Sequence, residues 1–317
     1  MRAAVLYGAK DFQMEELSSP EVKADECLIE VKACGVCHSE ISQWETRLNG
    51  LDYPRYIGHE VAGVIIESGQ NVTGFNRGER VAVWVDGKGY AEQVAAHQNQ
   101  IFPLAEGISF AEAMAEPIGC TTNAINRTNI QQGDIVALAG TGFMGLIMLQ
   151  QIKLSGAVKV IAIDIRDDML ELAGQLGADM LINPKKMDVV KEVRNITKDK
   201  GVDICFEVGG SQGTLDLAAA ICRMEGKLVI FGYHPGSRTI KDLGYWNWMA
   251  FDIINAHFRD LQQILDGTRR GMHMLNADKV KMNQLITHRY KLEQINEAFD
   301  AAVSKPKGFV KSVITLD

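Results

Sequence analysis

The chain has 317 residues, of which 46% are hydrophobic and 23% charged, and its formal net charge is −7. A chain of this length usually divides into two domains, because single cores stop growing beyond about 250–300 residues. Acidic and basic residues are interspersed without a concentrated basic face, which argues against a nucleic-acid partner. No apolar run approaches the roughly 20 residues that span a bilayer, and the N-terminus lacks the pattern of a secretory signal, so we expect a cytoplasmic protein without membrane contact.

Short strands separated by glycines are predicted for the first hundred residues. They are expected at residues 3–6, 26–33, 61–67, 80–85 and 91–95, in irregular antiparallel β-structure. From Ser109 the apolar pattern becomes helical toward Arg127. After a turn at residues 131–134 strands and helices alternate, which predicts a domain boundary near residue 121.

The middle of the chain predicts an α/β domain with a parallel sheet. Apolar strands are expected at residues 135–139, 159–163, 180–182, 202–208 and 227–231, with helices at 143–154, 167–176, 188–197 and 214–224. Such alternation is typical of a doubly wound sheet with right-handed crossovers. Beyond Gly232 the apolar residues follow no regular period. Helices are then expected at 261–265 and 292–303, and strands at 284–290 and 309–316 are expected to return to the first domain.

A glycine-rich turn joins the first strand of this α/β region to its first helix. Gly140, Gly142 and Gly145 have the spacing that seats a dinucleotide pyrophosphate on a helix N-terminus. Asp164 closes the next strand, where a carboxylate can accept hydrogen bonds from the adenosine ribose, so NAD is favoured over NADP. Asp164 could instead only cap the following helix, and the cation of Arg166 keeps the choice of cofactor open. Further cofactor contacts are expected from Phe143, Met144, Gly209, Gly210, Gly232, Tyr233 and His257.

Three segments within the first 116 residues carry side chains that suit zinc. Cys37 lies in the run Cys-Gly-Val-Cys-His-Ser-Glu, His59 and Glu60 follow a glycine, and Glu116 precedes a proline. Thiolate, imidazole and carboxylate are the ligands of a zinc ion with an open position. Each segment also has a plainer interpretation: a buried cysteine or a redox pair with Cys34, surface polarity, or a helix end. Their joint occurrence ahead of a dinucleotide loop favours zinc, and the six cysteines are expected to be reduced.

Over nearly the whole chain these segments resemble the zinc-dependent alcohol and polyol dehydrogenase branch of the medium-chain dehydrogenase/reductase superfamily. The resemblance rests on residues 33–40, 58–63, 77–82, Glu116-Pro117 and the glycine loop, which stand in family order. It implies a GroES-like β-barrel catalytic domain that holds the metal, built from residues 1–120 and 257–317. A Rossmann domain for the cofactor would be inserted at residues 121–256, with the active site in the cleft.

The resemblance also implies individual roles. Cys37 and His59 would be zinc ligands, and Glu60 and Glu116 would be the two carboxylates that share the remaining coordination. The resemblance does not decide which of the two carboxylates binds zinc directly. Ser39 matches the hydroxyl that passes the substrate proton outward, and because Ser42 stands where some relatives carry a relay histidine, the proton is expected to leave through water. The family's four-cysteine lobe is missing between residues 80 and 93, so no structural zinc is expected. A homo-oligomer, dimer or tetramer, is implied.

A polar set of side chains is expected to line the substrate pocket. It suits a molecule with several hydroxyl groups, so a polyol, sugar or cyclitol is the expected substrate, oxidised by hydride transfer to NAD. An amino-alcohol dehydrogenase of the threonine-oxidising type and a non-enzymatic dinucleotide-binding protein remain alternatives. Arg47 and Arg289 could also form only salt bridges, and His257 could be an ordinary interior residue. The predicted pocket residues are Gln43, Trp44, Arg47, Arg289 and His257.

Overall fold

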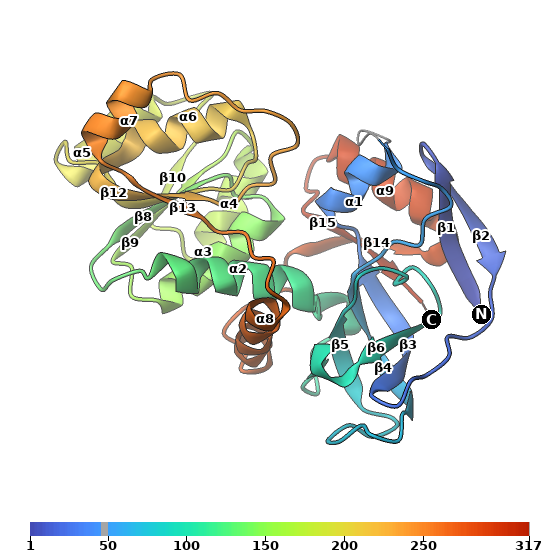
Figure 1. The fold of residues 1–317 in the computed structure, drawn as a ribbon. Helices are drawn as coiled ribbons and strands as arrows, with labels where there is room; N and C mark the ends of the chain where they lie inside the picture. The colour runs from blue at the N-terminus through green and yellow to red at the C-terminus, as the bar shows by residue number, and fades with distance from the viewer. Residues whose placement is uncertain (46–49, 317) are drawn as a thin grey trace. The chain divides into compact units, whose positions relative to one another are not determined.

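The computed structural model describes residues 1–45 and 50–316. The chain forms two compact units, Met1–Gly119 together with Leu265–Asp317, and Cys120–Ile264 (Figure 1). The second unit ends at Ile264, whereas residue 256 is the end expected from the sequence. No helix among the described residues is long and apolar enough to cross a membrane.

The first unit is built mainly on β-structure. Its larger sheet has the order β14-β15-β3-β4-β5-β7, with β6 also paired to β3, and β1 and β2 form a separate antiparallel pair. The C-terminal strand β15 pairs antiparallel with β3, so the end of the chain returns to the first unit as expected. The strands are β1 (Arg2–Gly8), β2 (Asp11–Glu16), β3 (Glu26–Gly35), β4 (Glu60–Ser68), β5 (Arg80–Trp84), β6 (Gln93–His97), β7 (Ile101–Pro103), β14 (Ile286–Lys291) and β15 (Lys311–Thr315).

An aromatic cluster anchors the helices of this unit. Phe12, Trp44, Tyr90 and Phe299 are buried, and the contacting rings lie 5.0 to 6.0 Å apart between centroids. Such ring contacts stabilise beyond the area that they bury. The cluster therefore holds α1 (His38–Trp44) and the Tyr90 segment against α9 (Ile295–Ser304).

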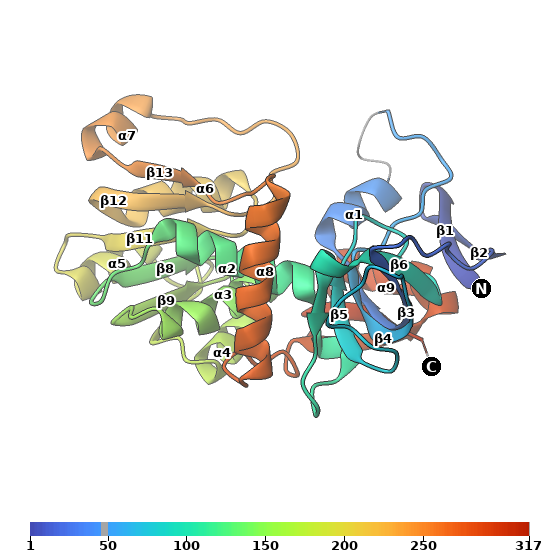
Figure 2. The ribbon, with the colours of Figure 1, turned by 60° about the horizontal axis from the view of Figure 1, so that its bottom comes forward.

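The second unit is a doubly wound parallel sheet, which confirms the predicted fold class. Its order is β10-β9-β8-β11-β12-β13, and every neighbouring pair is parallel. Figure 2 shows β9, β8, β11, β12 and β13 in succession. The strands are β8 (Ile135–Ala139), β9 (Lys159–Ile163), β10 (Met180–Ile182), β11 (Val202–Glu207), β12 (Cys222–Ile230) and β13 (Asp252–Asn255).

Helices connect these parallel strands. Because all the strands run in one direction, the loops that leave β8, β9, β11 and β12 meet at the carboxyl edge of the sheet, where dinucleotides bind in such folds. The helices are α3 (Phe143–Leu154), α4 (Asp167–Gln175), α5 (Val189–Thr197), α6 (Gln212–Ile221) and α7 (Leu243–Met249), while α2 (Ala115–Thr128) and α8 (Leu261–Asn276) carry the chain across the unit boundaries.

Candidate metal centre and cofactor edge

Pairing of β3 with β4 brings the predicted metal ligands together. Gly35, at the end of β3, lies opposite Glu60, at the start of β4. Cys37 lies two residues after the end of β3 and His59 directly precedes β4. One donor atom from each of Cys37, His59 and Glu60 lies within 4.8 Å of the others. Donors on one zinc ion, with bonds of about 2.0–2.3 Å, are about 3.3–3.8 Å apart. Small side-chain movements would thus let the three share an ion, so the donor set fits zinc.

A buried carboxylate orients the histidine. Glu40 Oε1 lies 2.7 Å from His59 Nδ1, which leaves Nε2 as the nitrogen for a metal. Glu40 also accepts hydrogen bonds from the backbone N–H of Gly58 at 2.8 Å and from the Tyr90 hydroxyl at 2.5 Å. Burial raises the pKa of Glu40, but the charge of His59 and these hydrogen bonds hold that pKa below its ordinary value. Glu40 therefore remains an anion beside the histidine.

Neither Glu40 nor Tyr90 was assigned a role from the sequence, although Glu40 belongs to the motif that contains Cys37. Glu40 was detectable in principle, because it stands three residues after Cys37 on the same short helix. Tyr90 donates to Glu40 and to the carbonyl of Gly35 at 3.0 Å, and burial, followed by the charge of Glu40, raises its pKa well above the ordinary value. Its contact with Glu40 spans 50 positions, so no local pattern could reveal it.

Glu60 forms an ion pair with Lys311, a residue that no sequence motif indicated. Lys311, on β15, places Nζ 2.9 Å from Glu60 Oε1 and 2.6 Å from Oε2, and both side chains are almost fully buried. The contact with Oε2 lacks hydrogen-bond geometry, so this buried oxygen still has capacity for a ligand. Burial raises the pKa of Glu60, while Lys311 opposes that shift. Glycine at 35 makes room, since a Cβ there would lie 2.0 Å from Glu60 Oε2.

Glu116 and Ser39 lie close to this group. Glu116, in the first turn of α2, is outside the set of donors within 4.8 Å, although its charge raises the pKa of both Glu60 and Lys311. The Ser39 hydroxyl donates to Cys37 Sγ at 3.3 Å. Cys34 is fully buried and its pKa is raised well above the ordinary value by burial, and none of the six cysteines, all among the described residues, is in a disulfide. Cys34 and Cys37 thus form no disulfide.

The glycine loop after β8 has the shape of a phosphate cradle. A Cβ at Gly145 would lie 2.3 Å from the carbonyl oxygen of Gly140, so this glycine lets α3 pack closely on the strand end. Gly142 is exposed, has no neighbour within 4 Å of an added Cβ, and provides no side-chain cap for α3. The first N–H groups of α3, at Phe143 and Met144, are therefore suited to an anion such as a pyrophosphate.

Asp164 lies at the end of β9 and connects two loops. It accepts hydrogen bonds from the backbone N–H of Thr141 and of Arg166, both at 2.9 Å. Two of its roughly four acceptor positions remain for a ribose. The guanidinium of Arg166 donates hydrogen bonds to the carboxylate of Asp168, at 2.7 and 3.2 Å.

Comparison with known proteins shows which protein families the chain matches. Residues 23–125 match the family described as "Alcohol dehydrogenase GroES-like domain" and residues 144–266 the family described as "Zinc-binding dehydrogenase". Sorbitol dehydrogenase of Bacillus subtilis (strain 168) is 29% identical over 336 residues, covering 96% of this chain and 94% of that protein. L-threonine 3-dehydrogenase of Pyrococcus horikoshii is 30% identical over 326 residues, 93% of this chain and 92% of its own.

The chain belongs to the zinc-dependent medium-chain dehydrogenases. This confirms the resemblance drawn from the motifs. The crystal structure of 2R,3R-butanediol dehydrogenase from Bacillus subtilis shares the fold with a TM-score of 0.86 and 24% identity, covering 100% of this chain and 99% of that chain.

For this medium-chain dehydrogenase, the predicted pocket residues lie in different environments. Trp44 is 0% exposed in the aromatic cluster, and its indole N–H donates to Asn296 at 3.2 Å. Its place in the substrate pocket stays a prediction. Gln43 is partly exposed and accepts a hydrogen bond from Arg55 at 2.9 Å. Arg289 is exposed on β14. Arg47 falls outside the described residues.

The remaining cofactor predictions lie at the carboxyl ends of β11, β12 and β13. Gly209 and Tyr233 are exposed and Gly232 is buried. His257 stacks on Phe231 with centroids 6.1 Å apart, and its Nε2 lies 3.3 Å from the carbonyl of Gly232. Burial lowers the pKa of His257, which favours the neutral ring.

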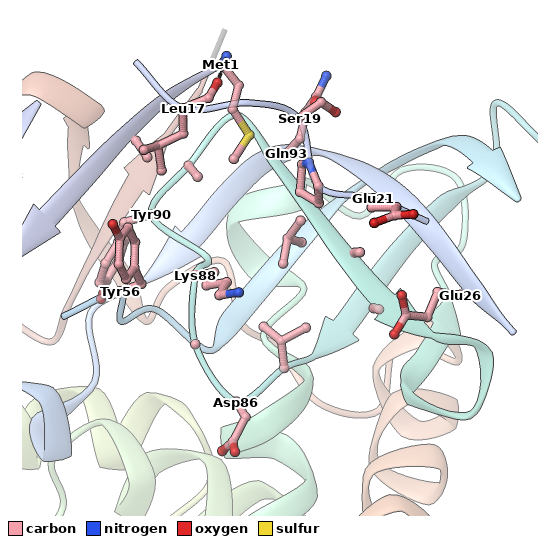
Figure 3. A pocket seen from close by; sticks show the side chains of 18 of the residues that line it. Met1, Leu17, Ser19, Glu21, Glu26, Tyr56, Asp86, Lys88, Tyr90 and Gln93 are labelled. Atoms are coloured by element: carbon pink, nitrogen blue, oxygen red, sulfur yellow. Dashed lines mark hydrogen bonds between the residues drawn. The ribbon is translucent and has the colours of Figure 1, made fainter. Parts of the chain in front are cut away.

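A cavity of about 830 Å³ also lies in the first unit (Figure 3). Its wall includes Tyr56, Lys88 and Gln93 together with Tyr90, and it contains none of the predicted ligand or pocket residues. Residues 85–88 of this wall belong to the short segment that replaces the four-cysteine lobe of the family. Tyr90, which lines the cavity, donates a hydrogen bond to Glu40 of the metal group.

Proposed function

We propose that this dehydrogenase transfers hydride between NAD and a secondary alcohol of a polyol, sugar or cyclitol. The observation that carries the proposal is the clustering of Cys37, His59 and Glu60 in a chain that also has a glycine loop for a dinucleotide. The similarity to sorbitol dehydrogenase supports the substrate class.

The residues have distinct tasks in this proposal. When bound, zinc supplies a Lewis acid that lowers the pKa of a substrate hydroxyl, and NAD accepts the hydride. Cys37, His59 and one or both of Glu60 and Glu116 would hold the ion. Glu40 keeps the His59 ring in a fixed orientation. Ser39, whose hydroxyl is 3.3 Å from Cys37 Sγ, accepts the substrate proton and releases it to water.

The cofactor and the assembly complete the proposal. Asp164 would accept hydrogen bonds from the adenosine ribose and repel a 2′-phosphate, which favours NAD over NADP. One zinc ion per subunit is proposed, because the segment at residues 85–90 contains no cysteine. We also propose a homo-oligomer, for which the exposed edge strand β13 and the exposed Trp248 offer a surface.

Threonine oxidation is the second candidate within the same reaction class. The similarity to L-threonine 3-dehydrogenase supports it to a comparable extent over the whole chain. The two candidates differ in the charge of the substrate, since threonine carries an ammonium and a carboxylate whereas a polyol carries neither.

A substrate panel separates the candidates. Purified protein would be assayed by NAD reduction with polyols, cyclitols, sugar acids, threonine and simple alcohols, each with NAD and with NADP. We expect the highest kcat/KM with a polyol or cyclitol and NAD. Preference for threonine would establish the second candidate, preference for NADP would contradict the role of Asp164, and absence of turnover by zinc-loaded protein that binds NADH would favour a non-enzymatic dinucleotide-binding protein.

A further inference from the structure

Two loops at the carboxyl edge of the parallel sheet touch through their backbones. The loop after β11 contains Gly210, with φ at +66°, and the loop after β12 contains Gly232 and Tyr233. A Cβ at Gly210 would lie 2.3 Å from the Tyr233 carbonyl oxygen, and one at Gly232 would lie 2.4 Å from the Gly210 nitrogen. Glycine is required at both positions because the loops approach each other so closely.

A fully buried carboxylate lies beneath this contact. Glu207, the last residue of β11, is 0% exposed. Its Oε1 accepts hydrogen bonds from the Gly210 N–H at 2.7 Å and the Thr214 hydroxyl at 2.6 Å. Its backbone carbonyl accepts from the Gly232 N–H at 2.8 Å. Glu207 therefore binds both loops, and its Oε2 needs a donor of its own.

His234 supplies that donor, and its neighbours determine its tautomer. His234 Nε2 lies 2.6 Å from Glu207 Oε2, while Arg238 Nε donates to His234 Nδ1 at 3.1 Å. An arginine has no acceptor, so Nδ1 must offer its lone pair and the ring proton must be on Nε2. Arg238 also donates to the Gly210 carbonyl at 2.9 Å. A neutral imidazole thus completes a closed ring of hydrogen bonds from Glu207 through His234 and Arg238 to Gly210.

The position of these hydrogen bonds at the edge of the sheet indicates which part of the cofactor they support. In a doubly wound sheet the pyrophosphate lies at the first strand and the adenosine at the second, so the nicotinamide half extends over the other side of the switch point. Here the glycine loop follows β8 and Asp164 directly follows β9, whereas the hydrogen-bonded group of Glu207, His234 and Arg238 joins the loops after β11 and β12. We propose that His234 is a positioning residue that orders these two loops to receive the nicotinamide half of the cofactor.

The inference rests on the proposed use of NAD. It is tested by comparing the binding of NADH, which contains both halves of the cofactor, with the binding of ADP, which lacks the nicotinamide half. Dissociation constants for NADH and for ADP would be determined by calorimetry for the unaltered protein, His234→Ala, His234→Gln and, as a control, His273→Ala. His273 is exposed on α8 in the first unit. Alanine leaves Oε2 of the buried Glu207 without its donor, so NADH should bind about tenfold more weakly or worse, while ADP binds as before.

The glutamine variant keeps an N–H for Glu207 and should recover most of the NADH affinity, and His273→Ala should change neither value. Unchanged NADH binding by His234→Ala would overturn the inference, as would an equal loss of ADP and NADH affinity in both His234 variants. Absence of NADH binding by the unaltered protein would instead overturn the proposed function, and the inference with it. Nitrogen-15 NMR of the His234 imidazole needs no ligand and should show the neutral Nε2–H tautomer. The Nδ1–H tautomer would contradict the hydrogen-bond assignment.

Discussion

At the scale of single residues, the metal group depends on side chains that do not themselves bind metal. Tyr90→Phe removes the hydroxyl that donates to Glu40 at 2.5 Å but keeps the buried ring in its aromatic cluster. With one donor fewer, Glu40 holds His59 less firmly, and we expect zinc affinity to fall about tenfold. Chelator competition measures this, with thermal unfolding as a check that the fold is retained. Equal zinc affinity in both proteins would show that Tyr90 has only a packing role.

Lys311 balances the charge of Glu60 when no metal is bound. Lys311→Met leaves a buried carboxylate without its cation, which should destabilise the metal-free protein by about 3 kcal/mol or more. Bound zinc would then supply a positive charge that Lys311 no longer provides to Glu60, so added zinc should raise the unfolding temperature more in this variant than in the unaltered protein. Lys311→Arg serves as the control, since it keeps the charge. A zinc-induced shift that is no larger in Lys311→Met would contradict the pairing.

The pKa of His59 predicts a pH-dependent metal affinity. Burial lowers this pKa, but the charges of Glu40 and Cys37 outweigh burial and hold it well above its ordinary value in the metal-free protein. Zinc binds only the neutral ring, so protons compete with the metal until the pH exceeds that raised pKa. Zinc affinity should therefore increase from about pH 6 to about pH 8, with proton release detectable by calorimetry in two buffers. A constant affinity over this range would refute the prediction.

At the scale of elements, the pairing of β3 with β4 forms the metal group. Gly35→Ala places a Cβ 2.0 Å from Glu60 Oε2, so the carboxylate must leave its position. We expect zinc content after dialysis to fall at least tenfold. Gly8→Ala is the matched control, because a Cβ at Gly8 has no neighbour within 4 Å. Full zinc content in Gly35→Ala would mean that Glu60 does not contribute to the site.

Elements differed in how well the sequence predicted them. The strands at 135–139 and 159–163 coincide with β8 and β9, because strands buried on both faces are continuous apolar runs bounded by polar turns. Helix α7 and strand β13 were not predicted. Only Trp246 is buried in α7, and β13 is an edge strand without a buried residue, so neither has the alternation or the apolar stripe of a core element.

At the scale of the whole molecule, the sequence predicts the fold class and the ligand cluster, but not the residues that support the cluster. Short motifs name Cys37, His59 and Glu60 because the ligands follow directly from local segments. Lys311 and Glu60 are 251 positions apart, and the pairing of β15 with β3 and of β3 with β4 brings them together. The sequence could not show that Trp44 packs in the aromatic cluster, because an indole suits either a pocket or a core and its hydrogen-bond partner Asn296 is 252 positions away.

The central claim is that Cys37 and His59 hold a metal ion on which the activity depends. The most direct measurement is zinc per subunit by mass spectrometry in the purified protein, in Cys37→Ala, in His59→Ala and in the control His273→Ala, each paired with NAD reduction on the best substrate. We expect one zinc per subunit in the unaltered and control proteins, and loss of both metal and activity in the other two. Retention of activity by Cys37→Ala and His59→Ala without bound zinc would contradict it.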